Sequence, residues 1–282
     1  MTSPDKRGAG REFAIAAATH FVLMLGLVVA LYPVLWVLSI AFSPDGSAGG
    51  ALPLPASFSI EHFATLFEGD AVFLLQLGNS LLVAFATALV AVAIAAPAAY
   101  AMSRFDFYGR KATTRTLLAT QMFPGVAAAI PLFLILDFLG LIDTRLGLVL
   151  VYATTAVPFA IFQLRGAFDG IPKDLEEAAM VDGATRFVAF IRVILPAARP
   201  ALAVTVLFAF MTAWNEFILA ATFMAQESTF TAPVALQRYV GEFDAQWGVF
   251  SAGAVVVSLP VMLLFYALQR HLVGGLAGSV KG

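Results

Sequence analysis

The feature that most constrains this chain is a series of six long apolar segments, at about residues 13–42, 73–102, 116–138, 146–168, 198–223 and 248–270. Each exceeds the roughly 18 residues that mark a helix long enough to cross a bilayer. Inside the hydrocarbon core every backbone amide must find its partner within the protein, and a helix meets that requirement. The sequence therefore predicts an all-α polytopic membrane protein with six transmembrane helices.

Lys and Arg are distributed unevenly among the connecting segments. With the N-terminus inside, fourteen of them lie on the inner side, and only Arg145 and Arg238 lie on the outer side. Basic residues near spans are enriched on the cytoplasmic side, so we expect both termini to be cytoplasmic. The first apolar run is too long for a signal peptide and is interpreted as an uncleaved anchor. The expected organisation is a tail at 1–12, a transmembrane domain at 13–272 with a cytoplasmic loop at 169–197, and a tail at 273–282.

Several functional classes lack the residues that they need. The chain contains no cysteine and only three histidines, at unrelated positions, which argues against thiol catalysis and metal sites. It contains no G-x-x-x-x-G-K-[ST] motif that would hold the phosphates of ATP. The net charge of −2, without a separate basic patch, gives no indication of nucleic-acid binding. We therefore expect a protein that is not an enzyme and holds no cofactor or metal.

Residues 169–200 form the most charged stretch of the sequence. Pro172 suits the first turn of a short helix, and Asp174, Glu176 and Glu177 then lie near the positive end of its dipole. Gly183 is expected to end this helix. Thr185 is expected to cap a second short helix that ends before Pro196.

One face of the first short helix is predicted to be small and mostly apolar, because its residues recur at helical spacing: Leu175, Ala178, Ala179 and Asp182. An exposed helix of this kind between membrane spans is poorly explained by its own stability. We interpret it as an element that docks against another protein.

The spacing within this stretch resembles a known family motif. Glu177-Ala178-Ala179, Gly183 after three more residues, and Val193-Ile194-Leu195-Pro196 after nine more are similar to the EAA loop, E-A-A-x3-G-x9-I-x-L-P, with Val193 in place of the usual Ile. That loop marks the membrane subunits of ABC importers. Further segments resemble the maltose-type permeases of carbohydrate importers: "NSL" at 79–81, "AYAMSRFDFYGRK" at 99–111, "WNEF" at 214–217 and the ending "GLAGSVKG".

The resemblance implies a type I ABC importer fold in a bacterial or archaeal cytoplasmic membrane. It also implies partners: a second permease subunit in a heterodimer, two ATPase subunits that bind ATP and Mg²⁺, and an extracytoplasmic sugar-binding protein. The loop would couple to the ATPase through Leu175, Glu177, Ala178, Ala179, Asp182, Gly183 and Pro196. The tail would reach the ATPase through Gly278, Ser279, Val280 and Lys281.

Polar residues inside the spans are candidates for the substrate pathway or a gate: Asn79, Ser80, Trp214, Asn215 and Glu216. A carboxylate near the middle of a bilayer costs about 2.5–3.5 kcal/mol on insertion scales, so Glu216 is not expected to face lipid. These residues either line a water-filled cavity that receives a sugar, or form structural hydrogen bonds and gate contacts with the partner permease. The sequence leaves both interpretations open.

The leading functional hypothesis is an ATP-driven sugar importer in which this chain forms half of an alternating-access pathway. An ABC importer for an amino acid or a peptide, with the same loop, is the alternative. A secondary transporter would be expected to show ion-binding carboxylates at mid-depth, and only Glu216 qualifies. Acidic residues of the outer loops would receive the binding protein: Asp45, Glu61, Glu68, Asp70, Glu227, Glu242 and Asp244.

Overall fold

A computed structural model of the protein describes residues 6–47, 52–55, 57–68, 72–123, 125–241 and 245–279. Regular structure in these ranges is helical, apart from one isolated bridge between Val240 and Ala245. The chain divides into two compact units, one of residues 1–68 with 239–256 and one of residues 69–238 with 257–282, and each is described by itself.

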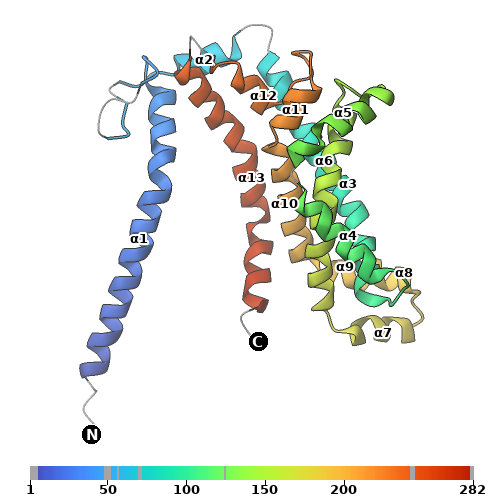
Figure 1. Ribbon diagram of the computed structural model, residues 1–282. Helices are drawn as coiled ribbons and strands as arrows, with labels where there is room; N and C mark the ends of the chain where they lie inside the picture. Colours follow the sequence, from blue (N-terminus) through green and yellow to red (C-terminus); the bar gives the residue numbers. More distant parts are fainter. Residues whose placement is uncertain are drawn as a thin grey trace. The chain divides into compact units, whose positions relative to one another are not determined.

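The larger unit is built on three apolar helices, α3 (Val72–Arg104), α6 (Arg145–Asp169) and α10 (Arg199–Trp214), which pack against one another (Figure 1). A row of alanines on α3 lies at the centre of this packing: Ala84, Ala88, Ala91, Ala95 and Ala99, each at most 1% exposed. Their spacing places them on one helix face, and small side chains let neighbouring helices approach closely. The alanine row therefore explains why α3 is the central helix of this unit.

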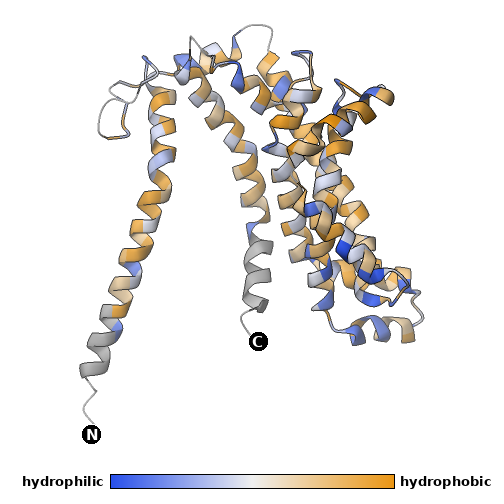
Figure 2. Ribbon diagram, in the orientation of Figure 1, coloured by the Kyte–Doolittle hydropathy of each residue, from blue (hydrophilic) through white to orange (hydrophobic). Residues whose placement is uncertain are grey.

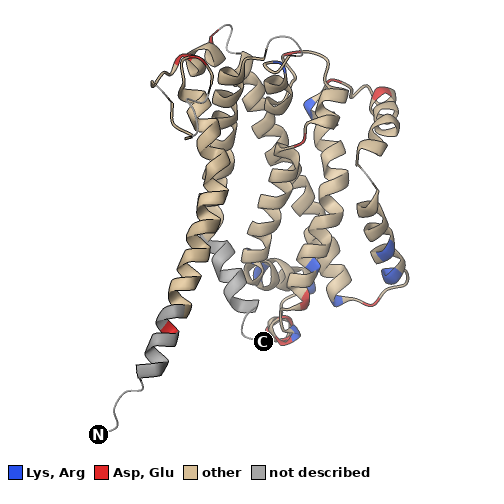
Figure 3. Ribbon diagram, turned by 60° about the vertical axis from the view of Figure 1, so that its left-hand side comes forward, with Lys and Arg blue, Asp and Glu red and all other residues tan. Residues whose placement is uncertain are grey.

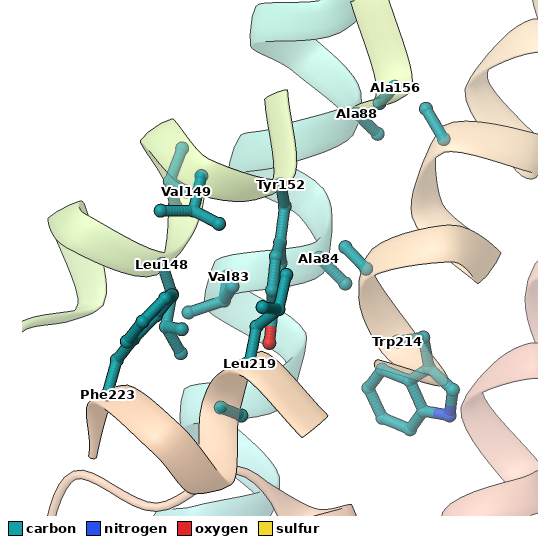
Figure 4. Packing of buried hydrophobic residues seen from close by; sticks show 14 of the residues in the cluster. Val83, Ala84, Ala88, Leu148, Val149, Tyr152, Ala156, Trp214, Leu219 and Phe223 are labelled. Atoms are coloured by element: carbon teal, nitrogen blue, oxygen red, sulfur yellow. The ribbon is translucent and has the colours of Figure 1, made fainter. Parts of the chain in front are cut away.

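Larger side chains fill the space on either side of the alanine row. In Figure 4, Val83 of α3 lies beside Leu148 and Tyr152 of α6, with Trp214 of α10 and Phe223 of α11 (Ile218–Phe223) closing the cluster. A second cluster lies nearer the other end of α3. It joins the ends of α3 and α6 to the segment that precedes α10.

Shorter helices complete the larger unit. They are α4 (Arg110–Met122), the 3-10 turn η1 (Gly125–Ala128), α5 (Ala129–Phe138), α7 (Lys173–Val181), α8 (Arg186–Ala189), the π-helix η2 (Phe190–Ile194), α9 (Leu195–Ala197) and α12 (Ala232–Gln237). In Figure 2 the hydrophobic colour dominates α3, α6 and α10, whereas α7 carries both hydrophilic and hydrophobic residues.

The smaller unit consists of α1 (Lys6–Phe42), α2 (Glu61–Phe67) and the beginning of α13 (Trp247–Ser279), a helix that continues into the larger unit. Apolar side chains of α1 from Ile15 to Leu35 are exposed in the single chain. At the other end of α1, the ring of Phe42 packs on Phe58 and Phe63 at 4.8 and 4.9 Å between centroids. At the start of α2 the Glu61 N–H donates a hydrogen bond of 3.1 Å to Ser59 Oγ, and Ile60 precedes the helix directly.

Four of the six predicted spans are continuous apolar helices of sufficient length: Ile15–Phe42, Val72–Arg104, Arg145–Asp169 and Trp247–Gln269. The other two predicted spans are interrupted. Between 116 and 138 the chain passes from α4 through η1 to α5, and between 198 and 223 α10 ends at Trp214 before α11 begins. Two bent helix pairs, Arg110–Met122 with Gly125–Phe138 and Arg186–Ala197 with Arg199–Trp214, raise the number of candidate spans to as many as six, by length and composition. The count of six therefore stays a prediction.

Candidate functional site

The first helix of the 169–197 loop, α7, begins one residue later than predicted and has a well-defined end. Pro172 directly precedes α7 instead of occupying its first turn. Gly183 has a positive φ of 91°, a conformation that disfavours any residue with a Cβ. The N–H of Ala184 donates to Ala179 O (3.0 Å) and the N–H of Gly183 to Met180 O (3.1 Å), which is the Schellman pattern of helix termination. The sequence predicted the stop at Gly183 correctly.

The second helix of the loop begins as predicted and ends later than predicted. Thr185 Oγ1 accepts a hydrogen bond of 3.3 Å from the Val188 N–H and so caps α8. The expectation that this helix ends before Pro196 was wrong, because η2 and α9 carry the helical path to Ala197. In the π-turn the Leu195 N–H bonds to Phe190 O, five residues back, so the register shifts just before the proline. Half-buried Pro196 is accommodated within the path.

A buried carboxylate fixes α7 to the bundle. Glu176 is only 6% exposed, and its Oε1 accepts a short hydrogen bond from the Tyr100 hydroxyl of α3. Its Oε2 lies 3.2 Å from Nε of Arg104, the last residue of α3. The same guanidinium donates through Nη2 to Ile171 O at 2.8 Å. We call this group of three residues, Glu176, Tyr100 and Arg104, the inner anchor. It joins the loop to the end of a predicted membrane span.

Neighbouring contacts reinforce the inner anchor. The Tyr100 ring packs against Phe190 at 4.6 Å between centroids and meets Phe168 edge-on. Ser103 Oγ donates to Asp169 Oδ1 at 2.6 Å. The underside of the loop is therefore held by polar and aromatic contacts with α3 and the end of α6.

The opposite face of α7 is uncovered. Leu175, Glu177, Ala178 and Asp182 are exposed, as is Gly183, while Ala179 is half-buried. Two large apolar side chains add to this surface, Val181 at 87% and Phe187 at 73% exposed. We call this surface of α7 and the start of α8 the docking face. It consists of Leu175, Glu177, Ala178, Ala179, Val181, Asp182, Gly183 and Phe187. A fixed underside and an uncovered upper side with large apolar side chains suit a helix that docks against a partner.

Most of the blue Lys and Arg segments of the larger unit gather at the end that carries α7 and the beginning of α4 (Figure 3). This matches the asymmetry from which the orientation was predicted. By the positive-inside tendency this end is expected to face the cytoplasm, and that orientation stays a prediction.

Asn79 and Ser80, two of the candidate pathway residues, are buried and tie a loop to α3. Asn79 Nδ2 donates to Ser228 O and to Phe230 O, both at 2.9 Å. Ser80 Oγ accepts from the Ala232 N–H at 2.8 Å. Gln76, one turn earlier, donates to Glu227 O at 3.0 Å. These side chains therefore fix the segment 227–232, which leads into α12.

Glu216 lies at the break between α10 and α11. Its Oε1 accepts from the Leu219 N–H (2.9 Å), and its Oε2 from the Ala220 N–H (3.1 Å) and the Tyr152 hydroxyl (2.8 Å). The carboxylate thus accepts bonds from amides of the first turn of α11, which have no partner within that helix. Glu216 and Tyr152 are named here the outer anchor.

The other two candidates at this break differ in exposure. Trp214 is buried and stacks on Phe210 at 5.3 Å between ring centroids. The Asn215 side chain is exposed, so it is the member of the five candidates most open to a ligand. The structure brings Trp214, Asn215 and Glu216 together at one break and places Asn79 and Ser80 at another contact.

Asp143 is a residue that sequence reasoning missed. It has a positive φ of 58°, and its Oδ1 accepts hydrogen bonds from the Ala225 N–H (3.0 Å), the Gln226 N–H (3.3 Å) and the Thr229 hydroxyl. Burial acts to raise the pKa of Asp143, but these hydrogen bonds outweigh it and leave the pKa below its ordinary value. The only sequence signal for this role is an Asp in a turn between two apolar segments.

Sequence reasoning also missed the inner anchor. It noted Glu176 as a charge near a helix terminus and did not pair it with Tyr100 or Arg104. The four tail residues cannot be compared in full: Val280 and Lys281 lie outside the described residues, and Gly278 and Ser279 end α13. Among the acidic residues of the outer loops, Asp70, Glu242 and Asp244 also lie outside the described residues.

Residues 91–277, which include both short helices of the loop and both carboxylate anchors, match the family described as the inner membrane component of binding-protein-dependent transport systems. The chain belongs to this family. The permease is 38% identical over 270 residues to the trehalose transport system permease protein SugB of Mycobacterium tuberculosis, which covers 94% of this chain and 98% of that protein. It is 37% identical to the diacetylchitobiose uptake system permease protein DasC of Streptomyces coelicolor, over 94% and 95% of the two chains.

The fold of the permease is also that of a solved importer. A crystal structure of a bacterial ABC transporter involved in the import of the acidic polysaccharide alginate contains a chain that superposes with a TM-score of 0.77. The match covers 96% of the permease and 99% of that chain at 24% sequence identity. The expected all-α fold of a type I ABC importer permease is therefore confirmed.

Proposed function

We propose that the permease forms half of the translocation pathway of an ATP-driven, binding-protein-dependent importer of disaccharides or oligosaccharides. Two relatives that align over nearly the whole chain carry saccharides in their names, and the structural neighbour belongs to a polysaccharide importer. The importer resides in the cytoplasmic membrane as a multi-pass complex. In it this permease has six spans and both termini in the cytoplasm.

The observation that carries the mechanism is the contrast between the two sides of α7. Glu176 binds the underside of α7 to Tyr100 and Arg104, so a movement of this helix is passed to the end of α3. The docking face remains uncovered for an ATPase subunit. Closure of the ATPase on ATP would then move α7, and through the inner anchor it would move the bundle.

We infer three further kinds of partner from the missing ATP-binding motif, the exposed apolar helix surface and the acidic outer loops. ATP and Mg²⁺ are bound by two ATPase subunits, because the chain has no phosphate-binding motif of its own. A second permease subunit completes the pathway and covers apolar helix surface such as that of α1. An extracytoplasmic sugar-binding protein delivers the substrate to the outer loops, where Asp45 and Glu61 line a cavity of about 420 Å³ in the smaller unit.

The test is stimulation of ATP hydrolysis in a reconstituted complex. The permease is assembled with its second permease, the ATPase and the binding protein, and trehalose, maltodextrin and diacetylchitobiose are compared with amino acids and peptides. We expect a saccharide to stimulate hydrolysis. Stimulation by amino acids or peptides alone would contradict the sugar assignment. Ion-driven uptake by the purified chain without an ATPase would instead indicate a secondary transporter.

A variant at the stop of α7 tests the coupling step separately. Gly183→Pro forces φ to about −65° at a position where φ is 91°, so the end of α7 cannot form. We expect membrane insertion to stay normal and stimulation to be lost. Full stimulation in this variant would exclude the proposed role of the loop.

A further inference from the structure

The motif at 99–111 serves two purposes in the structure, and only the first belongs to the coupling loop. Its beginning supplies Tyr100 and Arg104 to the inner anchor. Its end lines a cavity of about 620 Å³ with the first residues of α4 and with Arg165 of α6. Coupling through α7 does not account for this second part.

The cavity is strongly basic. Four cationic side chains line it, Arg110, Lys111, Arg115 and Arg165, against one acidic side chain, Asp106. Two of the four cations are already paired: Arg110 lies 2.6 Å from Asp106, and Arg165 lies 3.6 Å from Asp169.

The remaining two cations are available for a ligand. Lys111 and Arg115 are exposed, and within the part of the chain that the structure describes neither forms an ion pair. Because paired and unpaired cations line the same cavity, it has an excess of positive charge that an anion would neutralise.

The surface beside these cations is apolar. Lys111, Arg115, Leu118 and Met122 follow one another at helical spacing on α4, and all four are exposed. From Lys111 to Met122 the helix rises about 16 Å, from a basic end to an apolar end. Two aromatic side chains, half-exposed Phe107 and fully exposed Tyr108, lie at the basic end.

We propose that this cavity binds the headgroup of an anionic phospholipid of the inner leaflet, with the acyl chains along Leu118 and Met122 of α4. Basic pockets between membrane helices on the cytoplasmic side suit phosphate headgroups, and aromatic residues favour the same depth. An acidic protein surface would satisfy the cations but would leave the apolar continuation of the helix face without a partner. The proposal rests on the cytoplasmic orientation proposed above.

The experiment counts the lipids that the assembled complex retains from nanodiscs of equal phosphatidylglycerol and phosphatidylcholine, by native mass spectrometry. Removing both unpaired charges in Lys111→Gln/Arg115→Gln is expected to lower the ratio of retained phosphatidylglycerol to phosphatidylcholine by roughly 25-fold, since each basic residue near an anionic surface contributes about a fivefold factor. The charge-retaining Lys111→Arg/Arg115→Lys variant is the matched control and should keep the ratio of the unaltered complex.

Two results would overturn the proposal. The first is an unchanged ratio in the Gln variant, and if that variant also loses the ATPase subunits, the cavity is assigned to a protein surface. The second is release of phosphatidylglycerol by an equal concentration of inorganic phosphate, which would assign the cavity to a free anion. Lipid retention is measured without ATP or substrate, so failure of the transport assay leaves this readout intact.

Discussion

The two glutamates that bind tyrosines of the bundle, one at each end, use their remaining hydrogen bonds differently. At the inner anchor Glu176 binds only side chains, Tyr100 and Arg104, and is nearly completely buried. At the outer anchor Glu216 binds one side chain, Tyr152, and two backbone amides of α11.

The two glutamates illustrate two structural roles of a polar group in a membrane protein: joining two helices and stabilising a break in a helix. Contacts between side chains attach one intact helix, α7, to another, which is the attachment that the proposed coupling requires. Contacts to backbone amides stabilise a break in a helix, because the first amides of α11 have no partner within it. A carboxylate within a predicted span can therefore serve to stabilise the backbone, whether or not it also contacts a substrate.

The largest effect is expected at the inner anchor. Glu176→Ala leaves the buried guanidinium of Arg104 without its carboxylate, and breaking a buried pair in this way costs about 3–5 kcal/mol. We expect amide hydrogen exchange across α7 to accelerate strongly and substrate-stimulated ATP hydrolysis to be lost. The control is Glu177→Ala, at the exposed neighbouring position, which should leave the exchange rates unchanged. Slow exchange across α7 in Glu176→Ala would contradict the anchor.

A smaller effect is expected at the outer anchor. Glu216→Ala removes the acceptor of the Leu219 and Ala220 amides, and an unsatisfied buried group costs about 1–3 kcal/mol. Exchange at 217–223 should accelerate, whereas Tyr152→Phe, which removes only one hydroxyl, should have a weaker effect in the same segment. If Glu216→Ala impairs transport and leaves exchange unchanged, the residue acts on the substrate pathway instead.

The left-handed conformation of Gly183 at the end of α7 can be tested by a mild substitution. A Cβ at position 183 would meet no atom within 4 Å, so Gly183→Ala causes no steric clash and acts through its left-handed backbone, at about 1–2 kcal/mol. The thermal unfolding midpoint should fall by a few degrees. The matched control is Gly166→Ala in α6, which also has open space and no positive φ, and it should be neutral or slightly stabilising. Equal midpoints for the two variants would contradict this explanation.

The smallest effect is expected at Asp143 and depends on pH. Its pKa is lowered in the folded protein, so its stabilising contribution is fully present above the ordinary value of about 3.9 and is lost as pH falls through the lowered value. Exchange in the turn at 224–229 should therefore stay slow from pH 7 to about 5 and rise in stronger acid. Asp143→Asn should show faster exchange at neutral pH and no acid-dependent step. A step that persists in Asp143→Asn would assign the titration to another group.

Much of the architecture could be predicted from the sequence because hydrophobic length and charge distribution are local properties. The continuous spans, the stop at Gly183 and the cap at Thr185 all follow from such local signals. The inner anchor could not be predicted in this way, because Tyr100 and Glu176 are 76 residues apart and meet only through packing. The extension of the second loop helix past Pro196 depends on a π-turn that the sequence pattern does not reveal.

The sequence indicated that the candidate pathway residues are unusually polar for a membrane span. It did not indicate whether they bind the backbone or a solute. The structure places Asn79, Ser80 and Glu216 in hydrogen bonds to backbone groups, which leaves exposed Asn215 as the member most accessible to a solute. Contact of these residues with a sugar stays a prediction.

The proposed contact between the docking face of α7 and an ATPase subunit can be probed by site-specific cross-linking. The chain has no cysteine, so Ala178→Cys introduces the only thiol of the permease, on the exposed side of α7. We expect a cross-link from this thiol to the ATPase in the assembled complex, and none from the matched Ala112→Cys at the exposed start of α4. Labelling of Ala178→Cys by a membrane-impermeant reagent from the outer side, with no cross-link to the ATPase, would contradict the proposed contact.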